Sequence, residues 1–222
     1  MNGFCSLCLS RFTSFDFHFI ETTLRTALSE EERSWDHASL VEKLREPGLR
    51  IAATGHAYPL SISPEFYFFL LVDHSFQEAG ITDLAIIDYV AATLARHGAP
   101  SEVTRAQIDR PDRDFTYHLD FVEAMEGLHG YDRYFLQVRC GNQFLVMTGL
   151  FPGFLEERAR RRGAPGLSYY ESVARQAFLA AGEHPLAEEF RLQRMYPRLA
   201  DCFPDARLAL NRMSEKYLFL DS

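Results

Sequence analysis

The chain has 222 residues, and its 23 basic and 31 acidic side chains give a formal net charge of −8. A balance this acidic excludes a basic protein that coats nucleic acid. Hydrophobic residues make up 47% and aromatic residues 14% of the chain, which excludes a disordered polymer and indicates a folded protein with a sizeable core.

Apolar side chains recur at helical spacing through the first hundred residues. A pair with the capping-box spacing, Ser29 and Glu32, opens a second helix that Pro47 ends. The next segment, 49–62, is rich in Gly, Pro and Ser and is predicted to be a loop. Ser63 and Pro64 then begin an apolar helix. The helices predicted here cover 17–28, 29–46, 64–79 and 83–97.

The second half continues with helices, after a polar stretch at 98–114 that is predicted to be a long surface connection. Ser168 and Glu171 form a second capping-box pair, and Pro197 is expected to kink or split the helix that follows Pro185. The helices predicted here cover 115–129, 132–150, 154–162 and 169–181, followed by one from 185 that Pro197 interrupts and a last one from 204.

The segment 134–148 has two conflicting signals. Gly141 and Asn142 stand between two apolar runs, which is typical of a two-residue β-hairpin. A lone hairpin is only marginally stable, however, and every other element of the chain is helical. We therefore predict one buried helix over 132–150 and keep a short hairpin at 134–148 as the alternative.

These elements predict an all-α fold, a bundle of about eight to ten helices in one domain over 1–222, with a candidate sub-boundary in the polar loop 98–114. The last helix carries an apolar stripe at heptad-like spacing. That stripe predicts packing on the bundle or self-association as a homodimer. Its residues are Ala206, Leu210, Met213, Tyr217 and Leu220.

Two pairs of histidine and glutamate have the spacing of metal ligands. Glu126 and His129 follow each other at i and i+3, and His18 and Glu21 have the reverse order. A carboxylate and an imidazole three residues apart share one face of a helix, and helical di-iron proteins use two such pairs. The hypothesis is a site for iron, manganese or zinc. The alternative is a solvated helix face with no cofactor, and Gly127 inside the motif favours it.

Charged residues inside the most apolar segments indicate a second kind of site. Asp73 and His74 interrupt the helix that begins at Pro64, and Arg139 interrupts the segment 132–150. A buried charge must be paired, so we expect Asp73 and Arg139 to form a bidentate ion pair. This pair is either structural or the polar floor of a ligand pocket that His56 and Tyr170 also line.

Cysteine usage and the termini predict location. The four cysteines, Cys5, Cys8, Cys140 and Cys202, are too few for a disulfide framework, and Cys5 and Cys8 are expected to lie in a fraying terminus. No signal peptide is recognised, and the longest apolar run, 66–72, is too short to cross a bilayer. We predict a soluble cytoplasmic protein.

The strong catalytic and nucleotide-binding motifs are absent from the sequence. The arginine run that ends at Arg162 fits a helix C-terminus better than a nucleic-acid contact. Two classes of function remain. The first is a non-catalytic binding or protein-interaction protein, and the second is a metal-dependent helical enzyme.

Overall fold

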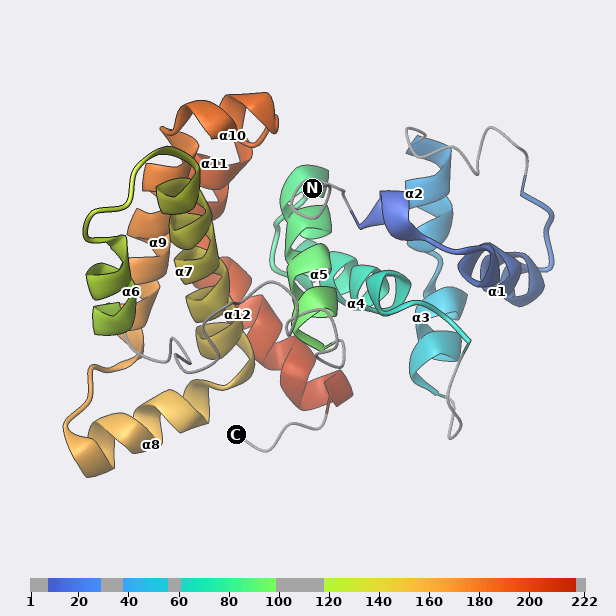
Figure 1. Ribbon diagram of the computed structural model, residues 1–222. Helices are drawn as coiled ribbons and strands as arrows, with labels where there is room; N and C mark the ends of the chain where they lie inside the picture. The colour runs from blue at the N-terminus through green and yellow to red at the C-terminus, as the bar shows by residue number, and fades with distance from the viewer. Residues whose placement is uncertain (1–7, 29–37, 56–60, 99–117, 219–222) are drawn as a thin grey trace. The chain divides into compact units, whose positions relative to one another are not determined.

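The computed structural model describes residues 8–28, 38–55, 61–98 and 118–218 (Figure 1). Helices and turns make up all the regular structure of these residues, which contain no strand, so the all-α prediction is confirmed. The chain divides into two compact units, Met1–Ala99 and Pro100–Ser222, and each is described by itself. Within the described ranges there are twelve α-helices rather than eight to ten, because one helix forms where a loop was expected and the helix after Pro185 divides.

The first unit is organised around a pair of helices, α4 and α5, which lie side by side (Figure 1). Both are apolar nearly all round, and they bury Phe66, Phe69, Ile87 and Val90 completely. Gly80, with φ of +80°, supplies the left-handed turn between them. The elements of this unit are the 3₁₀ turn η1 (Leu9–Arg11) and the helices α1 (Ser14–Leu24), α2 (Ala38–Leu44), α3 (Pro47–Thr54), α4 (Pro64–Glu78) and α5 (Leu84–Gly98).

Two predicted boundaries in this unit are wrong. Helix α1 ends at Leu24 rather than at residue 28, because Arg25 adopts the left-handed conformation with φ of 53°. Pro47 ends the preceding helix as predicted, but it also begins α3, where a loop was expected. Proline is well suited to a first helical position, since its missing N–H would have had no partner there. The capping box at Ser29 lies outside the described residues.

The N-termini of α1 and α4 are joined by one buried carboxylate, that of Asp16. It accepts hydrogen bonds from the Thr13 backbone N–H at 2.6 Å and from the Thr13 hydroxyl at 2.9 Å. It also accepts from the backbone N–H and the hydroxyl of Ser63, each at 2.7 Å. The Ser63 hydroxyl in turn accepts from the Phe66 N–H, which caps α4 as the sequence predicts.

The second unit is built on the long helix α7, which packs on α9 and α12 (Figure 1). Its elements are α6 (His118–Met125), α7 (Gly130–Leu150), α8 (Pro152–Arg162), α9 (Leu167–Gly182), α10 (Pro185–Glu189), α11 (Met195–Asp201), α12 (Phe203–Met213) and the π-helical turn η2 (Ser214–Leu218). Helix α7 is continuous, so the predicted buried helix is confirmed and the hairpin at 134–148 is not formed.

Close packing against neighbouring helices explains two glycines of α7, one of which, Gly141, belongs to the hairpin signal. A Cβ atom on Gly141 would lie 2.8 Å from the ring of Phe178 in α9, and one on Gly149 would lie 2.8 Å from Leu210 in α12. These positions therefore allow two helices to approach α7 closely. The carbonyls at the end of α7 also receive side-chain hydrogen bonds from α12, because the Asn211 amide donates to Thr148 and Gly149.

Two details of the C-terminal helices differ from the predictions. Gly166 precedes α9 without a side-chain cap, so Ser168 lies inside the first turn and does not form the expected capping box. The helix after Pro185 does split, but it does so before Met195, and Pro197 lies in the first turn of α11. In the apolar stripe of the last helix, Ala206, Leu210 and Met213 are buried and Tyr217 is half-buried, while Leu220 lies outside the described residues. Self-association through this stripe stays a prediction.

Candidate functional site

Asp73 is a buried acid of α4, and its partner is Arg45, which follows directly after α2. The Arg45 Nε donates to both carboxylate oxygens at 3.3 and 3.1 Å, and Nη2 donates to Oδ1 at 3.0 Å. The expected partner, Arg139, lies exposed on α7, so the prediction of a buried arginine there is wrong. Asp73 does form a bidentate ion pair, but with Arg45, an arginine of its own unit.

The other predicted pocket residues do not add a polar floor to this pair. His74 is half-buried, and its Nε2 lies 3.3 Å from the Glu78 carboxylate one turn further along α4. Tyr170 belongs to the second unit, where it is buried with its ring centroid 5.0 Å from that of Phe144. His56 lies outside the described residues. The predicted ligand pocket is thus not assembled by the residues that the structure describes within either unit.

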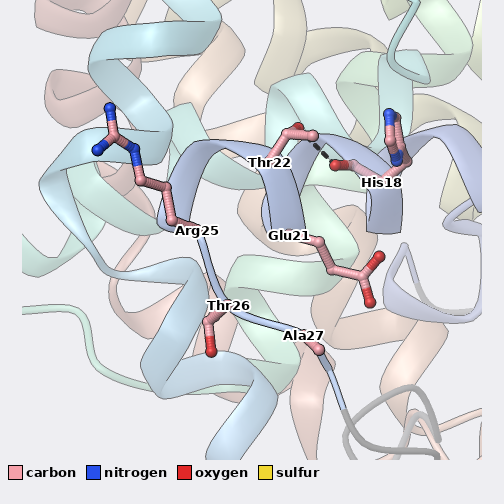
Figure 2. Close-up of a pocket in the computed structure, with 6 residues that line it drawn as sticks. All are labelled: His18, Glu21, Thr22, Arg25, Thr26 and Ala27. Carbon is pink, nitrogen blue, oxygen red and sulfur yellow. Dashed lines mark hydrogen bonds between the residues drawn. The ribbon is translucent and has the colours of Figure 1, made fainter.

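Figure 2 shows a surface depression at the C-terminal end of α1, with a volume of about 340 Å³. It includes the predicted metal ligands His18 and Glu21, but the imidazole and the carboxylate point in different directions. The Glu21 Oε1 accepts a hydrogen bond from the Leu28 N–H at 3.1 Å, which fixes the chain after the helix. The remaining lining residues, Thr22, Arg25, Thr26 and Ala27, are exposed.

The second predicted metal pair does not lie on a helix. Glu126 and His129 are exposed residues of the turn between α6 and α7. Gly127 lies in the turn after α6 with a φ angle of +78°, and Gly130, the first residue of α7, has a φ angle of +56°. The i, i+3 face that the metal hypothesis requires is therefore not formed here. Among the described residues, no three His, Cys, Asp or Glu side chains gather as metal ligands would.

A buried carboxylate that the sequence analysis missed lies in α5. Asp88 accepts hydrogen bonds from the backbone N–H groups of Cys8 at 3.0 Å and Leu9 at 2.9 Å. Burial raises the pKa of Asp88 to about 6, although the two hydrogen bonds oppose this shift. Cys8 is fully buried, and its thiol donates to the Glu65 carbonyl at 2.9 Å. The expectation that Cys8 lies in a fraying terminus is therefore wrong.

Helix α8 presents the clearest outward-facing set of side chains in the second unit. Leu155 is its single buried residue. Phe154 is 49% exposed and Phe151, which directly precedes the helix, is 39% exposed. The guanidinium carbon of Arg158 lies 5.2 Å from the centroid of the Phe154 ring, at a cation–π distance.

Three exposed or half-buried side chains lie along one face of α8. Residues 154, 158 and 161 are separated by four and three positions within the helix, and Phe151 directly precedes its first turn. We name the set Phe151, Phe154, Arg158 and Arg161 the α8 stripe. Phe151 is both the C-cap of α7 and the N-cap of α8, so a single residue joins the two helices. In Figure 1, α8 crosses the end of α7 at a steep angle.

Comparison with known proteins assigns no family to this chain. No protein-family model, no curated protein and no solved structure matches it. In the part of the chain that the structure describes, no helix combines the length and the apolar character needed to span a bilayer. The functional argument therefore depends on the side chains themselves.

Proposed function

We propose that the protein is a non-catalytic protein-interaction protein and that it binds its partner through the α8 stripe. The observation that carries the proposal is the exposure of Phe154 on a helix that buries only Leu155, together with the exposure of Phe151 directly before that helix. A surface helix of a globular protein normally turns a wide apolar stripe toward its own core. Helix α8 instead exposes Phe154, its single aromatic side chain.

The spacing of the stripe supports the same proposal. Helices that bind in the groove of a partner use anchors at i, i+3 or i+4, and i+7. Phe154, Arg158 and Arg161 follow this order within α8, and aromatic and arginine side chains are the residue types that contribute most binding free energy at protein interfaces. By contrast, the buried acids Asp73 and Asp88 hold structural hydrogen bonds or ion pairs.

Photo-crosslinking tests the proposal at one position. A photoreactive phenylalanine analogue replaces Phe154 in the full chain, and a control chain carries it at Leu179 of α9, which is 41% exposed. In an extract of the source cells, we expect a discrete protein adduct at position 154 and none at 179. The adduct protein is then purified, and its dissociation constant is measured directly with the unlabelled chain.

The affinity measurement decides the result. Loss of an aromatic anchor costs about 2 kcal/mol, so Phe154→Ala should weaken binding about 30-fold, while Leu179→Ala should change it less than about twofold. Equal adducts at both positions, or full affinity after Phe154→Ala, would contradict the proposal. Stoichiometric iron, manganese or zinc in protein purified without a tag would instead favour a metal-dependent enzyme.

A further inference from the structure

The partner of the α8 stripe can be assigned a chemical class, on the condition that the proposed function holds. We propose that the stripe binds an acidic, partly apolar polypeptide segment of another protein. Apolar side chains of that segment contact Phe151 and Phe154, and its carboxylates pair with the arginines at the other end of α8. The N-terminal end of α8 thus contacts the apolar part of the segment, and its C-terminal end contacts the carboxylates.

Apolar and basic side chains are separated along α8, and this separation is the first argument for the proposal. Both phenylalanines lie at the N-terminal end, and the four arginines, Arg158, Arg160, Arg161 and Arg162, lie within the last five residues. At 1.5 Å per residue, the stripe from Phe151 to Arg161 is about 15 Å long. An occupant that follows it must therefore change from apolar to charged over about 15 Å, which corresponds to about five residues of extended chain.

The charge of α8 carries the second step. Four arginines and two glutamates give this helix a net positive charge in a chain with a net charge of −8. Glu157 forms ion pairs with both Arg160 and Arg161, so the glutamates partly balance this end of the helix. Arg158 is placed against the Phe154 ring, which orders its guanidinium before a partner arrives. Guanidinium groups pair with carboxylates through two parallel hydrogen bonds.

The size of the charged patch argues against larger polyanions. Duplex nucleic acid presents a charge about every 1.7 Å along its axis, and an anionic bilayer presents a charged plane. Outside α8, the second unit has 16 acidic and 12 basic side chains, so a polyanion that extends beyond α8 would meet a surplus of like charge within the same unit. A short acidic segment meets α8 alone, because at physiological salt exposed charges are screened beyond about 8 Å.

The test uses the full chain and three labelled synthetic peptides that share an apolar first half and differ in the second half, which is rich in Glu, Gln or Lys. Fluorescence anisotropy gives their dissociation constants. We expect the Glu peptide to bind at least about fivefold more tightly than the Gln peptide, and the Lys peptide to bind most weakly. Duplex DNA and phosphatidylserine vesicles are measured in parallel and should bind more weakly than the Glu peptide.

Charge reversal on the helix assigns the effect to α8. Arg158→Glu with Arg161→Glu should weaken binding of the Glu peptide at least about tenfold. The matched control, Arg133→Glu with Arg212→Glu, changes the net charge equally at exposed positions of α7 and α12 and should weaken it less than about threefold. Equal loss in both double variants would mean a general charge effect and would overturn the inference.

The remaining outcomes separate this inference from the proposed function. If the Glu and Gln peptides bind equally and Phe154→Ala abolishes both, the acidic partner is wrong but a protein-interaction surface on α8 stands. If none of the peptides binds, the acidic partner is again wrong, and the crosslinking experiment alone decides the function. If DNA or vesicles bind most tightly and the α8 double variant abolishes that binding, both proposals fail.

Discussion

Replacing Gly141 with alanine tests the close approach of α7 and α9. The new Cβ atom would lie 2.8, 2.9 and 3.0 Å from three ring carbons of Phe178, whereas carbon atoms in contact prefer 3.5–4.0 Å. The ring cannot move away freely, because it is fully buried and stacks on Tyr196 with centroids 5.7 Å apart. The helices would have to separate, or the Phe178 side chain would have to leave its rotamer.

Two opposing contributions set the magnitude of this change. Alanine is favoured over glycine within a helix by about 1 kcal/mol, while overpacking of a core costs about 1 to 3 kcal/mol. Since three contacts are shortened against an immobile ring, we expect overpacking to dominate. The free energy of unfolding of the second unit should fall by about 1 kcal/mol, which lowers its melting temperature by about 4 °C.

Thermal unfolding followed by circular dichroism, together with urea titration, measures both quantities. Gly48→Ala is the matched control, because a Cβ atom there has no neighbour within 4 Å, and it should leave stability unchanged or slightly raised. Phe178→Leu should be less harmful in the Gly141→Ala background than alone, since the smaller side chain makes room for the new methyl group. A higher melting temperature for Gly141→Ala itself would refute the packing argument.

Two further predictions concern the buried acids of the first unit. Because the pKa of Asp88 is raised from 3.8 to about 6 in the folded protein, its contribution to stability is complete below about pH 4 and is lost as pH rises through about 6. The free energy of unfolding, measured in urea titrations, should therefore fall by about 2 to 3 kcal/mol over this pH interval. Asp88→Asn should remove this part of the pH dependence. An unchanged pH dependence in that variant would contradict the raised pKa of Asp88. Removing the partner of Asp73 with Arg45→Met should cost about 1 to 2 kcal/mol, less than for a fully buried pair because the Arg45 side chain is 41% exposed. Asp73→Leu added to Arg45→Met should recover part of this loss in thermal unfolding, and no recovery would mean that the charge of Asp73 is compensated in another way.

Local sequence patterns predicted the helices well, but they could not show which packing contacts an individual residue makes. Gly141 and Asn142 have the composition of a hairpin turn, yet Gly141 is there because Phe178 of α9 packs against the helix backbone. The sequence signal is the same in both cases. Only a partner far along the chain distinguishes them, so the helical prediction depended on the elements around it rather than on the residues themselves.

The candidate site shows a similar limit. An acid within an apolar helix must be paired, so the need for a partner of Asp73 could be predicted, but the choice of arginine could not. Arg139 was selected because it also stood among apolar residues, although one face of α7 is exposed there. Arg45 stands at the end of a helix, two residues before Pro47, and an arginine at a helix C-terminus is common, so nothing in the sequence marked it as a partner of Asp73. A contact between residues 28 positions apart leaves no periodic signal.

The α8 stripe was missed for a related reason. The arginines of 158–162 were recognised from the sequence, but the two phenylalanines before them resemble core residues of an amphipathic helix. Their exposure follows from how α8 leaves the end of α7, which depends on the single residue between the helices. Similarly, α6 ends before Glu126, in a turn that contains Gly127. Glu126 and His129 therefore do not share a helix face, although their spacing suggested a pair of metal ligands.

The one-residue junction at Phe151 has a consequence for how α8 could be used outside the intact protein. An isolated helix of fewer than about 12 residues is largely unfolded in water, and α8 has 11 residues. Its order is therefore imposed by α7, which holds the first turn at a fixed angle. A synthetic peptide with the sequence of α8 would have to fold as it binds, so it would compete weakly with the intact protein. A cross-linked peptide held in the helical form would avoid most of this loss of conformational entropy on binding and would compete better.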